Sequence, residues 1–152
     1  MNKTNITRPA HNFSLLAISF ALLLMFTTVA NADFSRDSDI VADSVTGLEW
    51  QDDESVEKSW EEAIEYCEAL ELGGHTDWRL PNFNELYTIA DHTKSNPAID
   101  DIFQAVASNG YWSSTTIVGD KNSAWGIGFS FGDGDWDNKS NSYYVRCVRA
   151  RD

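Results

Sequence analysis

Residues 75–86 read HTDWRLPNFNEL, and this stretch connects two predicted helices. It sets an acid, Asp77, an indole, Trp78, and a guanidinium, Arg79, side by side shortly before Pro81. In an extended segment Asp77 and Arg79 point to the same side and Trp78 points to the other. The stretch is therefore either a reactive site at a cleft or a clasp, in which the charged side chains order the loop while Trp78 fills the core. We favour the clasp and treat these residues as structural.

Helix starts are marked on both sides of this stretch. Ser59 and Glu62 have the spacing of a capping box, and apolar residues follow at helical spacing until two glycines at 73–74 end the run. Asn82 and Glu85 repeat the same spacing directly after the proline, and a second, shorter apolar stripe follows. The sequence therefore predicts two main helices, one from Ser59 and one from Asn82.

Strand patterns dominate the last third of the chain. Residues 125–131 alternate large apolar with small side chains, and residues 143–148 also alternate, which predicts two strands. A turn entering a short strand is predicted over 46–50, whereas 33–47 is otherwise polar and rich in turn residues. A short helical segment is predicted over 97–106. Two helices early and a small, mostly antiparallel sheet late indicate the α+β class.

The first 32 residues have the form of a signal peptide. Lys3 and Arg8 precede an apolar run, and Ala30-Asn31-Ala32 has the small-x-small form of a cleavage site. We therefore expect an exported protein, periplasmic or secreted, whose mature domain is residues 33–152 and is free of the membrane. That domain keeps all 24 acidic residues and nine of the 11 basic ones, a formal charge of −15. Such a charge disfavours nucleic acid and anionic lipid as partners.

The acidic residues are densest at the start of the first predicted helix. The run Asp52-Asp53-Glu54 is followed by Glu57, Glu61, Glu62 and Glu65. Acidic residues are favourable at a helix start, and nothing places two of these carboxylates across a cleft. We therefore interpret the run as a solvated surface and not as a glycosidase site.

The chain holds two cysteines, Cys67 and Cys147. A cysteine pair in an exported protein is more often a disulfide than a metal or redox site, and the spacing excludes a CxxC motif. Cys67 lies on the apolar stripe of the first predicted helix, where the strand at 143–148 can reach it. A bridge that closes a loop of this length would stabilise the fold by about 4 to 5 kcal/mol in the chain-entropy model. The alternative is two unpaired, buried thiols.

Five short motifs occur in order along the mature chain. They are TGLEWQ (46–51), WEEA (60–63) with Cys67, DWRLP (77–81) with Glu85-Leu86, YWSST (111–115) and YVRCVR (144–149). In this order they resemble the C-terminal domain family of Legionella collagen-like adhesins. The resemblance implies a C-type-lectin-like fold, shared with sulfatase-modifying factors, in a secreted or surface-facing module of the adhesion type. Within the motifs we treat Pro81 and Arg146 as structural. The adhesin is associated with sulfated glycans, for which a charge of −15 is a poor match.

The segment at 132–138 is the most suggestive for ligand binding. Asp133, Asp135 and Asp137 alternate in a glycine-rich stretch and could supply oxygen ligands to calcium, while Trp136 could stack on a sugar ring. It is not an EF-hand, because Asn138 stands where that loop needs glycine. The alternative is a solvated hairpin loop between two strands.

We predict a non-enzymatic, exported binding module whose partner is a glycan or a surface protein. Its candidate ligand-binding residues are Trp112, Trp136 and Asn138, on loops between residues 108 and 142, and calcium is the only cofactor considered. We assign no catalytic residues, because no GxSxG motif surrounds Ser113 and the mature chain has two histidines. Two alternatives stay open. One is an enzyme of the formylglycine-generating or sulfatase-modifying type, which needs spare reactive cysteines or a metal site, and the other is a structural periplasmic subunit.

Overall fold

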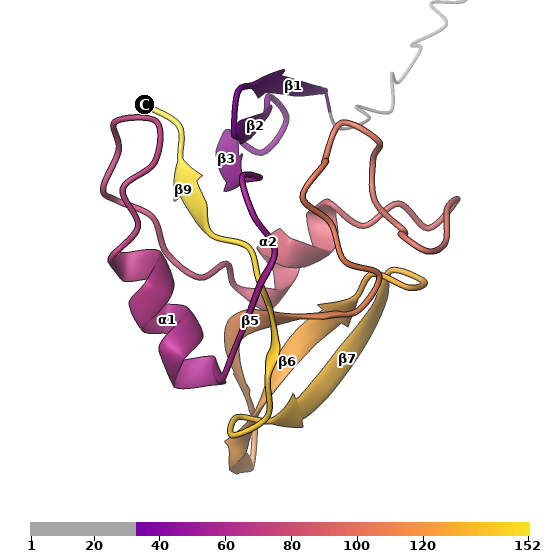
Figure 1. Cartoon of the computed structure of the whole chain (residues 1–152). Helices are drawn as coiled ribbons and strands as arrows, with labels where there is room; N and C mark the ends of the chain where they lie inside the picture. Colours follow the sequence, from indigo (N-terminus) through magenta and orange to yellow (C-terminus); the bar gives the residue numbers. More distant parts are fainter. Residues whose placement is uncertain (1–32) are drawn as a thin grey trace, which may run out of the picture.

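The computed structural model describes residues 33–152, so the predicted signal peptide lies outside the described residues. This part of the chain forms two β-sheets and two short helices (Figure 1). The elements in chain order are β1 (Phe34–Asp37), β2 (Ile40–Asp43), β3 (Leu48–Gln51), β4 (Val56–Lys58), α1 (Trp60–Glu68), α2 (Phe83–Thr88), β5 (Gly110–Ile117), β6 (Asp120–Gly128), β7 (Asp133–Asn138), β8 (Tyr143–Val145) and β9 (Val148–Ala150). The domain contains both element types, with more strand than helix.

The smaller sheet brings the two ends of the domain together. Its strand order is β1-β2-β3-β9, and every neighbouring pair is antiparallel. Val41, Trp50 and Val148 lie opposite one another across three of these strands and are fully buried. They belong to one hydrophobic cluster with Leu86 of α2 and Ile89, the C-cap residue of α2. This face of the sheet therefore packs toward α2.

The larger sheet has the order β4-β8-β5-β6-β7, so β4 and β7 are its two edge strands, and β7 lies at the edge beside β6 (Figure 1). All its pairs are antiparallel except β5 with β8. The alternation of large and small residues along β6 has a steric reason, because a Cβ on Gly126 would lie 2.4 Å from the carbonyl oxygen of Tyr111. The expectation of a strand closely approached on one side is met.

Both helices begin at the predicted residues. The backbone N–H of Ser59 donates to the Glu62 carboxylate over 3.0 Å at the start of α1, and Asn82 accepts from the backbone N–H of Glu85 over 2.9 Å at the start of α2. Helix α1 buries Ala63 and Cys67. Neither helix of residues 33–152 has the length and apolar character needed to cross a bilayer.

Three local predictions are wrong. The stretch 33–47, read as turn-rich, contains the β1–β2 hairpin, so four short strands precede the first helix. Residues 97–106 form no helix, and Ile99 instead bridges to Ala90. The single closing strand predicted over 143–148 is interrupted at residues 146–147, which leaves β8 in the larger sheet and β9 in the smaller one.

Candidate functional site

The DWR stretch fastens loops to the core. Trp78 is 2% exposed, and its indole N–H donates to the carbonyl oxygen of Leu72 over 3.2 Å. Arg79 donates to both carboxylate oxygens of Glu85, over 2.8 and 2.7 Å. This fork holds the pKa of Glu85 below its usual range. Arg79 thereby ties the loop to the first turn of α2.

Asp77 joins the other side of the same loop to the last strand. Its carboxylate accepts from Arg149 Nε over 2.7 Å, which lowers the pKa of Asp77. Arg149 is 2% exposed and also pairs with Glu49 over 2.6 Å. These are the contacts of a clasp, although Asp77 and Arg79 pair with other elements and not with each other.

A second network of charges is buried between the two sheets. Asp52 is 1% exposed and accepts from Arg146 over 2.6 Å and from the backbone N–H of Gln104 over 2.7 Å. Arg36 pairs with the same carboxylate. Arg146 itself is 2% exposed and lies over the Phe103 ring at 4.8 Å. The interpretation of the 52–54 run as a solvated surface is therefore wrong for Asp52, which is the counter-ion of two arginines.

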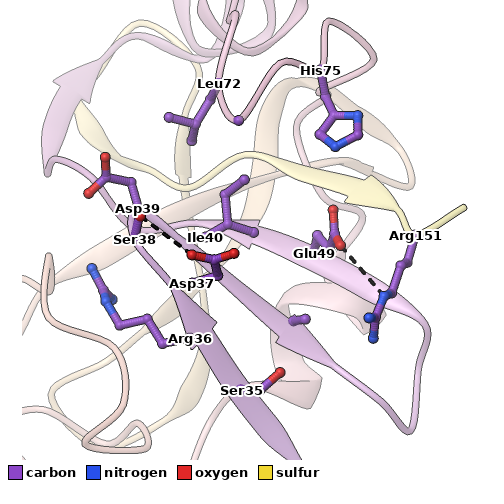
Figure 2. Close-up of a pocket in the computed structure, with 12 residues that line it drawn as sticks. Ser35, Arg36, Asp37, Ser38, Asp39, Ile40, Glu49, Leu72, His75 and Arg151 are labelled. Carbon is purple, nitrogen blue, oxygen red and sulfur yellow. Dashed lines mark hydrogen bonds and ion pairs between the residues drawn. The ribbon is translucent and has the colours of Figure 1, made fainter.

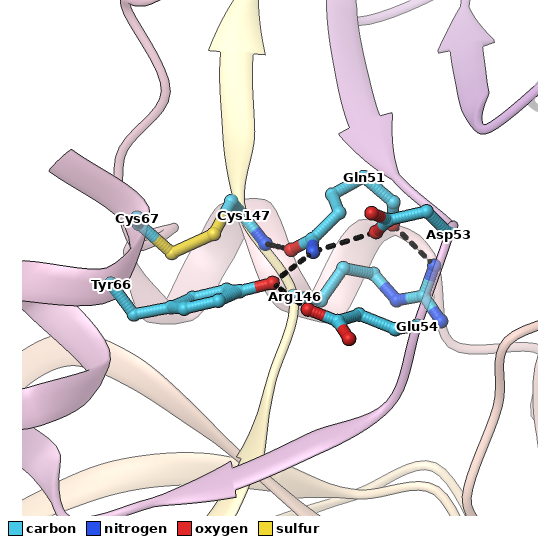
Figure 3. The surroundings of a disulfide bond; sticks show 7 residues. All are labelled: Gln51, Asp53, Glu54, Tyr66, Cys67, Arg146 and Cys147. Atoms are coloured by element: carbon cyan, nitrogen blue, oxygen red, sulfur yellow. Dashed lines mark hydrogen bonds between the residues drawn. A yellow bond between two sulfur atoms is a disulfide. The ribbon is translucent and has the colours of Figure 1, made fainter. Parts of the chain in front are cut away.

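The predicted disulfide is present. Cys67 on α1 is bonded to Cys147, the residue before β9, with their Cα atoms 5.4 Å apart. Gln51 lies beside the bridge, where its side-chain oxygen accepts from the backbone N–H of Cys147 and its amide N–H donates to Tyr66 (Figure 3). Tyr66 donates in turn to Glu54 over 2.7 Å, and burial raises the pKa of its hydroxyl. The bridge is thus surrounded by packed side chains.

Trp112 was a candidate ligand-binding residue, but its side chain is fully buried. The indole N–H donates to the carbonyl oxygen of Lys58 over 3.0 Å, and the ring stacks on Tyr143 with centroids 4.4 Å apart. A ligand cannot reach this side chain in the folded protein. Its position in the core corrects the prediction, and Trp112 is a packing residue.

Residues 133–138 form the edge strand β7 and not the predicted loop. Because residues two apart share a face, Asp133, Asp135 and Asp137 are spread along one side of the strand. Within residues 33–152 no group of three or more His, Cys, Asp or Glu side chains is arranged to hold a metal ion. The calcium site stays a prediction, and this arrangement does not favour it.

Two of these aspartates cover the free edge of the sheet. Asp135 accepts the backbone N–H of Trp136 over 2.8 Å, and Asp137 accepts that of Asn138 over 2.7 Å. Unpaired N–H groups on an edge strand are a template for pairing with another chain, and charged side chains oppose such pairing. The aspartates therefore have a structural role that needs no metal.

We expect the double variant Asp135→Thr/Asp137→Thr to self-associate through β7, because it frees two N–H groups and removes the repulsion between copies. We expect dimers with a dissociation constant below about 1 mM, which corresponds to an association free energy of about −4 kcal/mol or more favourable. Light scattering after size exclusion measures the mass of the species formed. The control is Glu65→Gln/Glu68→Gln on α1, which removes the same charge away from the edge and should stay monomeric. A monomeric edge variant would show that the aspartates do not protect this strand.

A group of aromatic side chains, two of them exposed and two half-buried, lies where α2 meets β6 and β7. This aromatic strip consists of Phe83, Tyr87, Trp125 and Trp136. Trp125 and Trp136 are directly opposite each other across the two strands, and Phe83 lies 5.6 Å from Trp125 and 5.9 Å from Tyr87 between ring centroids. Trp136 is 57% exposed and Tyr87 is 43% exposed.

The strip was only partly visible in the sequence. Trp136 was predicted as a ligand contact and is exposed, but Phe83 and Tyr87 were missed because the pattern after Asn82 emphasised the buried stripe at Leu86. Their signal was a spacing of four on a helix, which places two aromatic rings on a second face. Gly134 on β7 allows the Phe83 ring to approach this strand closely, because a Cβ at residue 134 would lie 3.1 Å from the ring.

Residues 39–149 match the family model described as the Lcl C-terminal domain. The match covers most of the described residues and includes the clasp, both cysteines, β7 and all four members of the aromatic strip. The chain matches no curated protein.

Proposed function

The chain belongs to the Lcl C-terminal domain family, and from this premise we propose that it is an exported, non-enzymatic binding module that recognises a glycan through its aromatic strip. The family suggests an adhesin-associated module. The ligand, its surface and the site of action are our proposal, and the observation that carries it is the exposed aromatic strip.

The strip has the properties of a sugar-stacking surface. Large apolar side chains on a soluble domain are ordinarily buried, and contiguous exposed ones indicate an interaction site. Trp136 and Tyr87 present ring faces together with a polar indole N–H and hydroxyl, which suits a ligand that has both apolar C–H faces and hydroxyl groups. Phe83 packs on Tyr87 and Trp125, so the Tyr87 ring loses little side-chain freedom on binding.

Hydrogen-bonding groups adjoin the strip. Asn138 follows Trp136 by two residues on β7, so their side chains share one face of the strand. It also lines a polar cavity of about 360 Å³ whose other lining residues are Ser59, Glu61, Lys121, Asn122, Lys139 and Ser140. A glycan stacked on Trp136 could extend into this cavity, where amide, hydroxyl and ammonium groups can bind its hydroxyls.

Binding is favoured over catalysis by the state of the cysteines. An enzyme of the formylglycine-generating type needs spare reactive cysteines or a metal site. Both cysteines of this chain are held in one bridge and are fully buried, so neither offers a thiolate to a substrate. This supports the binding proposal. A structural periplasmic subunit is the remaining alternative, and the experiment below distinguishes it.

The fold and the location of the protein are also inferred. Two mostly antiparallel sheets, two short helices and a disulfide between the first helix and the C-terminal segment support a C-type-lectin-like fold for residues 33–152. The apolar segment followed by Ala30-Asn31-Ala32 supports export, and a disulfide suits an oxidising compartment. Identification of Asp33 as the N-terminus of the exported protein would test the cleavage site.

The proposal is tested by binding of the purified protein to a broad glycan array. Trp136→Ala should weaken binding by about tenfold or more, because it removes the most exposed ring of the strip. This loss of affinity corresponds to about 1 to 2 kcal/mol of stacking free energy. The matched control is Val45→Ala, which truncates another exposed apolar side chain, in the turn between β2 and β3, and should bind like the parent.

The same array in calcium and in EDTA separates the remaining possibilities. We expect equal binding in both, because the β7 aspartates are not clustered. Signal lost in EDTA would restore calcium and contradict this part of the proposal. No glycan signal in either buffer would overturn the glycan proposal, and a protein captured by pull-down would then support a surface-protein ligand or a structural role.

A further inference from the structure

A cavity of about 370 Å³ lies on the smaller sheet, away from the aromatic strip. Its floor is the outer face of β1, β2 and β3, where Ile40, Ala42 and Glu49 share one side of the sheet, and its wall is the turn at 72–75 (Figure 2). This volume is at the lower end of the range for small-ligand pockets.

The wall of the cavity is held in place by several contacts. Leu72 and His75 exchange backbone hydrogen bonds of 3.1 and 3.0 Å, and Trp78 donates its indole N–H to the carbonyl oxygen of Leu72. Gly73 packs directly against Ile40, because a Cβ at this position would lie 2.3 Å from the end of the Ile40 side chain. The cavity is therefore present before any ligand binds, which lowers the entropic cost of binding.

The charges around the cavity are not balanced. The two arginines in its lining have partners, because Arg36 pairs with Asp52 and Arg151 lies 3.7 Å from Glu49. By contrast, neither Asp37 nor Asp39 makes an ion pair within residues 33–152, and both are exposed at the β1–β2 turn. In Figure 2 the Asp37 carboxylate lies beside Ile40, and the Asp39 carboxylate lies farther out at the left of the view.

We propose that this cavity binds an ammonium or guanidinium group carried on a short aliphatic chain. The cationic head would lie beside Asp37, with Asp39 in the same lining adding to the attraction, and the aliphatic stem would lie on Ile40 and Leu72, in the way that lysine and arginine stems cover apolar surface. The formal charge of −15 on residues 33–152 adds a long-range attraction for such a ligand.

An organic cation fits better than a metal ion. No cluster of three or more metal-ligating side chains exists in the described part of the chain, and two of the three floor residues, Ile40 and Ala42, are apolar. Two sources offer the required chemistry, the basic side chain of a partner protein and a free alkyl diamine. The proposal does not depend on the proposed function, because it uses the other sheet and a ligand of another class.

The test is a titration of the purified, isotope-labelled protein followed by the backbone amide signals. The probes are cadaverine, a tripeptide Gly-Lys-Gly with blocked ends, and the uncharged diol that matches cadaverine in length. We expect saturable shifts at Ile40, Leu72 and Gly73 with a charged probe and none with the diol. Binding of the diamine alone identifies a free ligand, and binding of the peptide identifies a partner's side chain.

Two variants and one control make the result specific. Asp37→Asn/Asp39→Asn should weaken the affinity by about tenfold, and Ala42→Leu should abolish binding by filling the floor without changing charge. Glu65→Gln/Glu68→Gln loses the same charge on α1 and should bind like the parent. Equal affinity in the Asp37/Asp39 variant, unsaturable shifts spread over all acidic residues, or no shift with either charged probe would overturn the proposal.

Discussion

Replacing Asp52 by Asn is expected to destabilise the protein by about 3 to 5 kcal/mol, because it leaves a buried arginine without its counter-ion. The Asp52 side chain is fully buried and receives hydrogen bonds from Arg146 and from the backbone N–H groups of Gln104 and Ala105, over 2.6, 2.7 and 3.1 Å. An amide of the same shape has no charge, and it presents an NH₂ group where the aspartate presents an acceptor. The loss is measured as a lower denaturant midpoint for unfolding.

Two further variants separate this effect from a general effect of lost charge. Asp53→Asn changes the adjacent, exposed carboxylate and keeps an oxygen that can accept from Gln51, so it should unfold like the parent. Adding Arg146→Met to Asp52→Asn removes the unpaired cation, and part of the lost stability should return. If the free energy of unfolding of Asp52→Asn alone is within about 1 kcal/mol of the parent value, the network contributes little net stability.

The position of Asp52 shows why sequence patterns identify charge but not its surroundings. In the sequence, Asp52 is the first of three successive acidic residues, a pattern typical of a solvated surface. Its partners Arg36 and Arg146 are 16 and 94 residues away, so no local spacing reveals them. The family motif drew attention to Arg146, but only the fold shows that it crosses between the sheets to reach Asp52.

Local rules predicted those parts of the fold that local contacts determine. The caps at Ser59 and Asn82 are formed within a single turn, and the steric exclusion of a side chain at Gly126 enforces the alternation along β6. Two of the failures depend on tertiary contacts that no local pattern shows. The β1–β2 hairpin is polar because one of its faces is open to the cavity, and Tyr143–Val145 and Val148–Ala150 separate because each pairs with a different sheet.

The candidate site was predictable to a similar degree. Trp136 was visible because an aromatic residue among aspartates has no reason to be buried, and it is exposed. Trp112 was misassigned because an indole in the sequence gives no sign of whether Lys58 and Tyr143 enclose it. The aromatic strip depends on α2 packing on β6, and two elements about 40 residues apart are brought together only by tertiary contacts.

Removal of the disulfide bridge between Cys67 and Cys147 is expected to lower the free energy of unfolding strongly. The bridge closes a loop of 80 residues, so its removal should cost about 4 to 5 kcal/mol in the chain-entropy model. Domains of this size are stable by about 5 to 15 kcal/mol, and the loss is therefore a large fraction of the total. The measurement is the denaturant midpoint of Cys67→Ala/Cys147→Ala against the oxidised parent.

Burial of the bridge decides how the comparison is made. Both cysteines are fully buried in a cluster with Trp78, Trp112 and Val145, so a reductant should reach the bond only when the domain unfolds. The parent is therefore reduced in denaturant and refolded in reductant, as a control that lacks the bond but keeps both sulfur atoms in the core. Equal loss in this control and in the alanine variant assigns the effect to the covalent constraint, whereas a larger loss in the variant assigns the difference to the cavity left in the core. Alkylation of two thiols in the parent, unfolded without reductant, would contradict the bridge itself.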